Sequence, residues 1–75
     1  MKKNAIVKGG KYTDNKGAVR EVLAVGPEYI AYGGQVGTDN LQYKLLAKKQ
    51  GPHMVGSIRN STRISFASWA KAKVN

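Results

Sequence analysis

The residues best suited to chemistry are cationic, and most of them follow residue 41. Six Lys or Arg residues and all four acidic residues precede that position, and seven Lys or Arg residues with no acid follow it. The seven are Lys44, Lys48, Lys49, Arg59, Arg63, Lys71 and Lys73. Cations without nearby counter-charges repel one another, so a folded chain tolerates them best when a polyanion offsets their charge. The net charge of +9 on 75 residues therefore predicts a polyanionic partner.

Each basic side chain suggests a particular contact with such a partner. Lysine ammonium groups act on phosphates as point charges, whereas Arg59 and Arg63 can make bidentate contacts with a phosphate or a guanine edge. Residues 59–63 form the densest group of polar donors in the chain, which suits phosphate oxygens. Tyr32 is the ring that we expect to face a ligand, where it can stack on a base. The alternatives are a charged surface that only aids solubility and an ordinary capped loop at 59–63.

Enzymatic chemistry has little support in the residue types. The chain has no cysteine and one histidine, His53, so the residue types that bind metals are nearly absent. Its four scattered carboxylates offer no evident acid–base pair. The glycine pairs at 9–10 and 33–34 lack the Gly-x4-Gly-Lys-Ser/Thr pattern of a phosphate-binding loop. We therefore expect no enzyme activity, no metal and no cofactor; an active site shared between subunits is the remaining route to catalysis.

The length and the apolar pattern limit the class of protein. Residues 1–75 make one small domain, and a chain of this size buries only about 60–65% of its unfolded surface. No apolar run approaches the roughly 20 residues of a membrane span, and Lys8 interrupts the apolar start of the chain. We expect a soluble cytoplasmic protein with no membrane partner, a location that the lack of cysteine fits.

The sequence predicts that short strands position the basic residues. Turn residues recur about every 8–12 residues, which is typical of a small all-β domain. The expected strands are residues 5–13, 18–25, 29–32, 41–48 and 54–59, with a hairpin turn at 14–17. In the fourth of these strands Leu41, Tyr43 and Leu45 share one face, which we assign to the core. Lys44 and Lys48 share the opposite face, because side chains alternate along a strand.

The hydrophobic period changes after residue 63. Residues 64–74 predict a helix with Ser65 as its N-cap. Ile64 and Trp69 have the spacing of a hydrophobic staple across the first turn. About ten residues cannot hold a helix in isolation, so Phe66 and Trp69 are expected to dock on the sheet and to plug one end of a barrel.

Two sets of residues carry a resemblance to known proteins. Residues 10–23 place a glycine (Gly10), an aromatic residue (Tyr12) and a turn glycine (Gly17) ahead of a Val-rich strand. This segment resembles the opening of KOW- or Tudor-type barrels. Together with the ending Phe-Ala-Ser-Trp-Ala at 66–70, it is also similar to small uncharacterised phage and prophage proteins that have a G-x-Y opening and an F-A-x-W-A ending. That group has no settled activity, so the second resemblance implies origin and compactness.

The strand pattern and the resemblance together imply a mainly β fold. The expected architecture is a small five-stranded SH3-like barrel over about 5–59, followed by a short C-terminal helix at about 65–74. The charge pattern adds the function: a non-enzymatic basic domain that binds nucleic acid mainly through phosphates. The phage resemblance favours DNA slightly, and the KOW-like opening favours RNA.

Seven basic residues and one tyrosine make up the predicted nucleic-acid interface. The predicted nucleic-acid-binding residues are Lys44, Lys48, Lys49, Arg59, Arg63, Lys71, Lys73 and Tyr32. One alternative is a small phage-like interaction or inhibitor protein that docks on an acidic host protein, with the positive half raising the association rate. A structural accessory domain whose charge only aids solubility is another. The sequence leaves the oligomeric state open.

Overall fold

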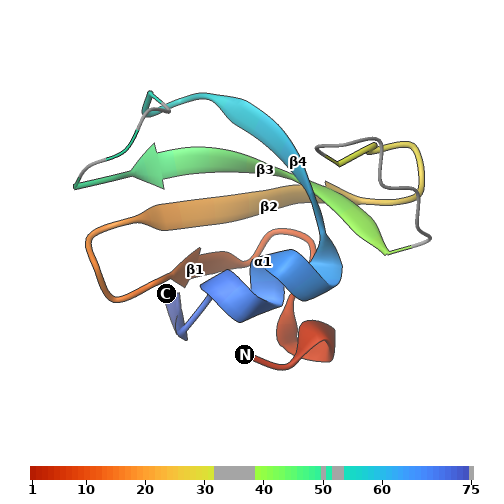
Figure 1. The fold of residues 1–75 in the computed structure, drawn as a ribbon, viewed down its shortest axis with the longest axis horizontal. Helices are drawn as coiled ribbons and strands as arrows, with labels where there is room; N and C mark the ends of the chain where they lie inside the picture. Colours follow the sequence, from red (N-terminus) through yellow and green to blue (C-terminus); the bar gives the residue numbers. More distant parts are fainter. Residues whose placement is uncertain (32–38, 50, 52–53, 75) are drawn as a thin grey trace.

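Five strands form one antiparallel sheet in the computed structural model, which describes residues 1–31, 39–49, 51 and 54–74 (Figure 1). The elements in chain order are η1 (Lys3–Ala5), β1 (Lys11–Thr13), β2 (Val19–Val25), β3 (Asn40–Ala47), β4 (Ile58–Thr62), α1 (Arg63–Trp69) and β5 (Ala72–Val74). The strand order is β4-β3-β2-β1-β5, so the first and the last strand are neighbours. The predicted mainly β class with a short C-terminal helix is confirmed. Among the described residues no pairing of the edge strands β4 and β5 closes the sheet.

The turn between β1 and β2 is the predicted hairpin turn at 14–17. The Asp14 carboxylate accepts hydrogen bonds from the backbone N–H groups of Lys16 (2.8 Å) and Ala18 (3.2 Å). Asn15 and Gly17 have φ angles of 61° and 96°, the left-handed region that asparagine and glycine tolerate best. The Asp14 carboxylate thus accepts the hydrogen bonds that backbone carbonyl groups accept in other turns, and this stabilises the reversal of the chain.

The alternation predicted for residues 41–48 is confirmed in β3. Leu41, Tyr43 and Leu45 are buried, and Lys44 on the other face is exposed. β2 pairs with β3 with two register irregularities, one between Val19 and Arg20 and one between Val22 and Ala24. Such irregularities bend a strand and increase its twist, so this central pair curves the sheet.

Three predicted strands differ from the observed ones. Residues 5–13 contain only the short β1, because the turn at 7–10 interrupts the strand with Gly9 at a φ of 84°. Residues 29–31 form no extended strand: the Gly26 and Glu28 carbonyl oxygens accept short-range hydrogen bonds from the Tyr29 and Ile30 N–H groups, and only Ala31 makes an isolated β-bridge. Residue 32 lies outside the described residues. β4 starts at Ile58, later than predicted, because Met54 and Ser57 close another turn.

The helix is shorter than predicted, and a different residue caps it. Thr62 is the N-cap of α1, and its hydroxyl oxygen accepts a hydrogen bond from the Ser65 N–H at 3.2 Å. The prediction of Ser65 as the cap was therefore wrong. The predicted staple is also wrong, because Ile64 is 68% exposed. The helix ends at Trp69, and the residues after it form β5, which pairs with β1.

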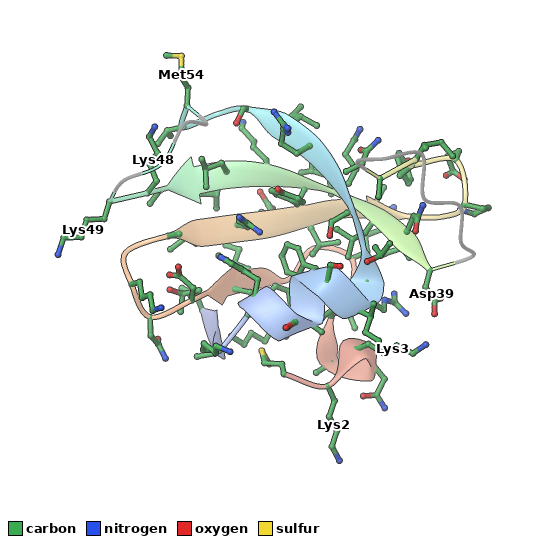
Figure 2. The ribbon with its side chains drawn as sticks, in the orientation of Figure 1. Lys2, Lys3, Asp39, Lys48, Lys49 and Met54 are labelled. Carbon is green, nitrogen blue, oxygen red and sulfur yellow. The ribbon has the colours of Figure 1, made fainter. Side chains whose placement is uncertain are left out.

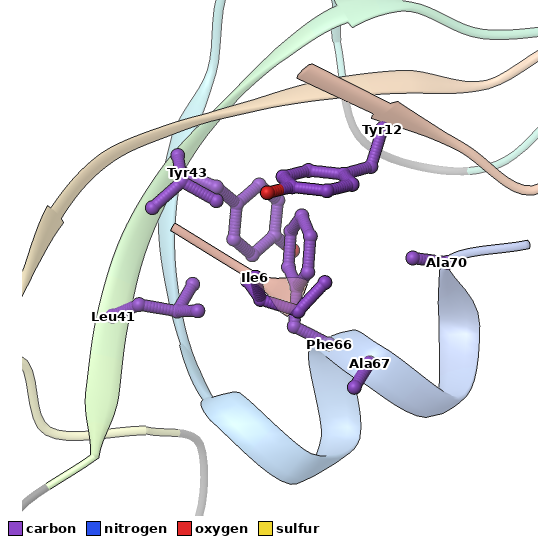
Figure 3. Close-up of a cluster of buried hydrophobic side chains, with 8 residues drawn as sticks. Ile6, Tyr12, Leu41, Tyr43, Phe66, Ala67 and Ala70 are labelled. Carbon is purple, nitrogen blue, oxygen red and sulfur yellow. The ribbon is translucent and has the colours of Figure 1, made fainter. Parts of the chain in front are cut away.

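α1 covers one face of the sheet and completes the core (Figure 3). The core residues are Ile6, Tyr12, Val22, Leu41, Tyr43, Phe66, Ala67 and Ala70. The Phe66 ring lies 5.7 Å from the ring of Tyr12, 5.4 Å from Tyr43 and 5.3 Å from Trp69, measured between centroids. Each aromatic pair of this kind adds about 0.5–1.5 kcal/mol beyond the burial of its area. The predicted docking of Phe66 and Trp69 on the sheet is confirmed.

Candidate nucleic-acid interface

Four lysines lie at one end of the sheet. The last row across four strands consists of Ala72, Thr13, Val19 and Ala47. Lys71 lies just before β5 and Lys48 just after β3, while Lys16 lies in the turn between β1 and β2. Lys49 lies beside that turn, since a Cβ added at Gly17 would come within 2.8 Å of the Lys49 Cβ. We call Lys16, Lys48, Lys49 and Lys71 the basic end.

The basic end presents its charges along a line across the sheet. Strands lie about 4.8 Å apart, so three spacings separate β5 from β3 and place Ala72 about 14 Å from Ala47 when measured along the sheet. Figure 2 shows Lys48 and Lys49 at the tip of the sheet, far from Lys2 and Lys3. The Lys48 ammonium donates to the carbonyl oxygen of Gly51 at 3.0 Å, and that of Lys71 donates to Ser68 at 3.1 Å. These neutral acceptors orient the ammonium groups and leave their charge in place.

One acid lies in the same turn as Lys16. Asp14 accepts backbone N–H groups, and the hydrogen bond from Lys16 N–H above all holds the pKa of this carboxyl below its usual range. Asp14 is therefore ionised at neutral pH and offsets part of the charge of the basic end.

Lys44 lies on the face of the sheet that α1 does not cover. Its cross-strand neighbours are Glu21 of β2 and Ile58 of β4, and Glu21 in turn pairs with Lys11 of β1. Opposite charges directly across a sheet attract one another. Glu21 thus offsets part of the charge of the two lysines on this face.

The two predicted arginines lie elsewhere. Arg59 is opposite Tyr43 on the edge strand β4. Arg63 starts α1 at the other end of the sheet, where its Nη1 lies 3.9 Å from Asp39 Oδ1 and its side chain is 21% exposed. The Lys3 ammonium lies 3.2 Å from Asp39 Oδ2. Arg63 therefore already has a carboxylate partner.

Asn60, Ser61 and Thr62 of the predicted donor group bind groups of the chain itself. The Asn60 amide donates to the Ile30 carbonyl oxygen at 3.1 Å, and the Ser61 hydroxyl donates to the Thr62 carbonyl oxygen at 2.8 Å. Thr62 caps α1. These contacts fit the alternative of an ordinary capped segment.

Lys73 lies in β5 and lines an open pocket of about 380 Å³. The pocket is lined by Val7, Lys8, Gly9, Gly10, Lys11, Lys73 and Val74. The sequence reasoning missed Lys8 and Lys11, because the first half of the chain is nearly balanced in charge. The available signal was the glycine pair at 9–10 with a lysine on either side.

Arg20 is a second residue that the charge pattern did not single out. Its guanidinium carbon lies 4.0 Å from the ring centroid of Trp69 and 4.7 Å from that of Tyr43. Burial lowers the pKa of Arg20, and its Nε is buried with no hydrogen-bond partner among the described residues. Arg20 shares the core face of β2 with Val22. This partly buried arginine therefore packs against the aromatic side of the core.

The predicted set is thus divided among several places. The structure brings Lys48, Lys49 and Lys71 to one end, with Lys73 next to them along β5. Lys44 lies on the open face of the sheet, and Arg59 and Arg63 lie on or after β4. Tyr32, the predicted stacking ring, lies outside the described residues.

Among the described residues, no three His, Cys, Asp or Glu side chains are grouped to hold a metal ion. No helix in the described ranges has the length and apolar character to cross a membrane. No family model, no curated protein and no solved structure matches the chain.

Proposed function

We propose that this protein is a non-enzymatic cytoplasmic domain that binds nucleic acid mainly through phosphates, with DNA slightly favoured over RNA. The uncompensated charge of the basic end carries the proposal. In the part of the chain that the structure describes, both ion pairs involve Asp39, with Lys3 and with Arg63. The basic end is therefore left with a single nearby acid, Asp14. The phosphates of a polyanion offset such charge, and the release of its condensed counterions favours binding.

We propose in addition that the sheet belongs to a small SH3-like barrel of the KOW or Tudor type. Five short strands, a helical turn before the last strand, and a last strand beside the first support this architecture. The irregular register of β2 against β3 supports the curvature that a barrel needs. The opening at 10–23 and the ending at 66–70 support an origin among small phage-like proteins.

The mechanism of binding is electrostatic. Lysines contact phosphates as point charges and read no base edge, so we expect little sequence preference. Four lysines that each neutralise one phosphate of duplex DNA give a slope of about −3 to −4 when the logarithm of the affinity is plotted against that of the salt concentration.

The test measures binding of labelled duplex DNA, single-stranded DNA and RNA by fluorescence anisotropy between about 50 and 200 mM salt. The double variant Lys48→Gln/Lys49→Gln should bind more weakly and reduce the salt slope by about 2. The double variant Lys2→Gln/Lys3→Gln is the matched control, because it removes the same charge at a distant place (Figure 2). A wild-type protein that binds none of these nucleic acids at the lowest salt would overturn the proposal.

A second candidate, docking on an acidic host protein, is favoured by an apolar surface at the edge of the sheet. Ile30 and Ile58 are 45% and 54% exposed. Both line an open pocket of about 430 Å³, together with Ala31, Gln42, Arg59 and Asn60. Exposed apolar groups rimmed by polar ones are typical of surfaces that bind proteins.

A nuclease treatment separates the two candidates. If a purified complex survives nuclease and is lost with Ile58→Asp, the protein partner is favoured. If nuclease removes the partner and Lys48→Gln/Lys49→Gln also removes it, nucleic acid is favoured. If neither treatment changes a chain that purifies alone, the charge serves solubility.

A further inference from the structure

Arg20 packs against an aromatic support at the end of α1. Its guanidinium carbon lies 4.0 Å from the centroid of the Trp69 ring and 4.7 Å from that of the Tyr43 ring. The buried Phe66 ring contacts both of them, with its centroid 5.3 Å from Trp69 and 5.4 Å from Tyr43. The guanidinium group is therefore restrained, and a ligand that binds it does not have to order it first.

The nitrogen atoms of this guanidinium group have no partner in the part of the chain that the structure describes. Nε is buried there without a hydrogen bond, and it is the only nitrogen of Arg20 in that state. The two Nη atoms take no part in the ion pairs of the described residues, since both pairs are made with Asp39 by Lys3 and Arg63. Because Arg20 is only partly buried, Nη1 and Nη2 form the end of the side chain that reaches solvent.

Packing alone does not account for a cation at position 20. A partly buried charge costs free energy, and a buried N–H group without a partner adds to that cost. An unbranched apolar side chain such as methionine would cover the same two rings without either cost. An anionic ligand offsets the cost of the charge, because it pairs with the guanidinium group and accepts hydrogen bonds from its exposed N–H groups.

Arg20 borders the basic end. Its ring partner Trp69 follows Ser68 in α1, and the Ser68 carbonyl oxygen accepts the hydrogen bond from the Lys71 ammonium at 3.1 Å. Two adjacent residues of the last turn of α1 thus contact a guanidinium and an ammonium group. Burial above all lowers the pKa of Arg20, and the charge of the nearby Asp14 carboxylate raises it. A polyanion that lies along the basic end therefore comes next to Arg20.

We propose that Arg20 is a further phosphate ligand, which binds through its two Nη atoms while Trp69 and Tyr43 support the guanidinium group. The inference rests on the proposed function, because the phosphate that we expect there belongs to a nucleic-acid backbone. Free phosphate or pyrophosphate presents the same chemistry and is the other source. The parallel N–H groups of Nη1 and Nη2 can donate to two oxygens of one phosphate, a contact that a lysine ammonium does not make.

The first arm of the test measures oligonucleotide affinity and its salt dependence in the full chain. Arg20→Met should weaken binding about tenfold, the effect of one lost charge-assisted contact, and lower the salt slope by about 1. Arg20→Lys keeps the charge and loses the planar fork, so it should keep the slope and weaken binding about threefold. A merely structural role of Arg20 would lower the affinity of the Met variant without changing its salt slope.

Lys2→Met is the matched control for the loss of one positive charge. Lys2 lies far from Lys48 and Lys49 of the basic end (Figure 2). Its loss should weaken binding less than about twofold, because salt screens distant charges. Thermal unfolding of the three variants verifies that each one folds.

The second arm uses the fluorescence of Trp69, which is the only tryptophan of the chain. Pyrophosphate that binds Arg20 changes the contact of the guanidinium group with the Trp69 ring. We expect a saturable change in Trp69 emission when pyrophosphate is added to the wild-type chain, and no such change with NaCl at the same ionic strength. The change should be lost in Arg20→Met and kept in Lys2→Met.

The two arms separate failure of this inference from failure of the proposed function. If the oligonucleotide binds and Arg20→Met equals the control in affinity and slope, the inference is overturned and the proposed function stands. A pyrophosphate signal that Arg20→Met removes supports the inference even when no oligonucleotide binds and the proposed function fails. If neither ligand has any effect, both are overturned. If polyglutamate changes Trp69 emission and pyrophosphate does not, the ligand is a carboxylate and the inference is overturned.

Discussion

Arg20 shows at the scale of one residue how this domain holds a partly buried cation against its core. Its guanidinium group lies over Trp69 and Tyr43, which together offer two aromatic faces. A cation over a desolvated ring gains about 0.5–2 kcal/mol. The buried Nε, unpartnered among the described residues, costs part of that gain. The long apolar stem of arginine also fills space beside the rings.

Substitution of Arg20 separates packing from charge. Arg20→Ala removes both the stem and the cation, so we expect the free energy of unfolding to fall by about 1–3 kcal/mol. Arg20→Met keeps the volume and removes the buried charge, so we expect a loss below about 1 kcal/mol. Urea denaturation followed by Trp69 fluorescence measures both changes. Equal losses in the two variants would show that the cation itself dominates.

At the scale of elements, α1 depends on a cap supplied by the preceding strand. Thr62 ends β4 and caps α1 through its hydroxyl oxygen. Because its polar side chain satisfies an N–H that the helix leaves without a partner, it also fixes where the strand becomes a helix.

The Thr62 cap predicts a clear contrast between two neighbouring polar residues. Thr62→Ala should lower the free energy of unfolding by about 1 kcal/mol, the typical cost of a lost N-cap. Ser65→Ala should change it by less than about 0.5 kcal/mol, because Ser65 contributes its backbone N–H to the cap and alanine favours helix. Chemical denaturation of both variants measures the difference. A larger effect at Ser65 would contradict the observed cap.

The elements that sequence predicts well are those with local causes. The turn at 14–17 depends on Asp14 and Gly17, and β3 depends on the alternation of Leu41, Tyr43 and Leu45. The end of the chain is different. Its alanines favour a helix locally, but the exposed edge of β1 offers backbone partners to residues 72–74, and this tertiary pairing overrides local propensity.

The candidate site follows the same rule. Lys48 and Lys49 were found because they are adjacent in the sequence and follow a clear strand. Lys8 and Lys11 become neighbours of Lys73 only through the pairing of β1 with β5, which local patterns do not reveal. The pairing of Arg63 with Asp39 likewise depends on how β3 and α1 meet.

At the scale of the whole molecule, the net charge of +9 acts on stability as well as on binding. Uncompensated lysines repel one another in the folded state, and salt screens this repulsion. The screening length falls from about 30 Å at 0.01 M salt to about 8 Å at 0.15 M. The second value is smaller than the distance across the sheet end, so repulsion between its lysines should weaken.

The salt dependence of stability tests this view. Raising NaCl from 0.01 to 0.15 M should increase Tm by about 4–8 °C, the shift that about 1 kcal/mol produces in a domain of this size. The variant Lys48→Gln/Lys49→Gln should show a smaller increase, because it removes two of the repelling charges. Differential scanning calorimetry measures both. An unchanged Tm in the wild-type chain would show that the charges are already compensated.

The position of β5 beside β1 has a consequence for how the molecule is made. During synthesis, β1 leaves the ribosome well before its neighbour β5. The edge of β1 therefore stays open until β5 emerges, when a contact of large sequence separation can close it. Such contacts slow the approach to the native state, so we expect folding on a millisecond-to-second scale.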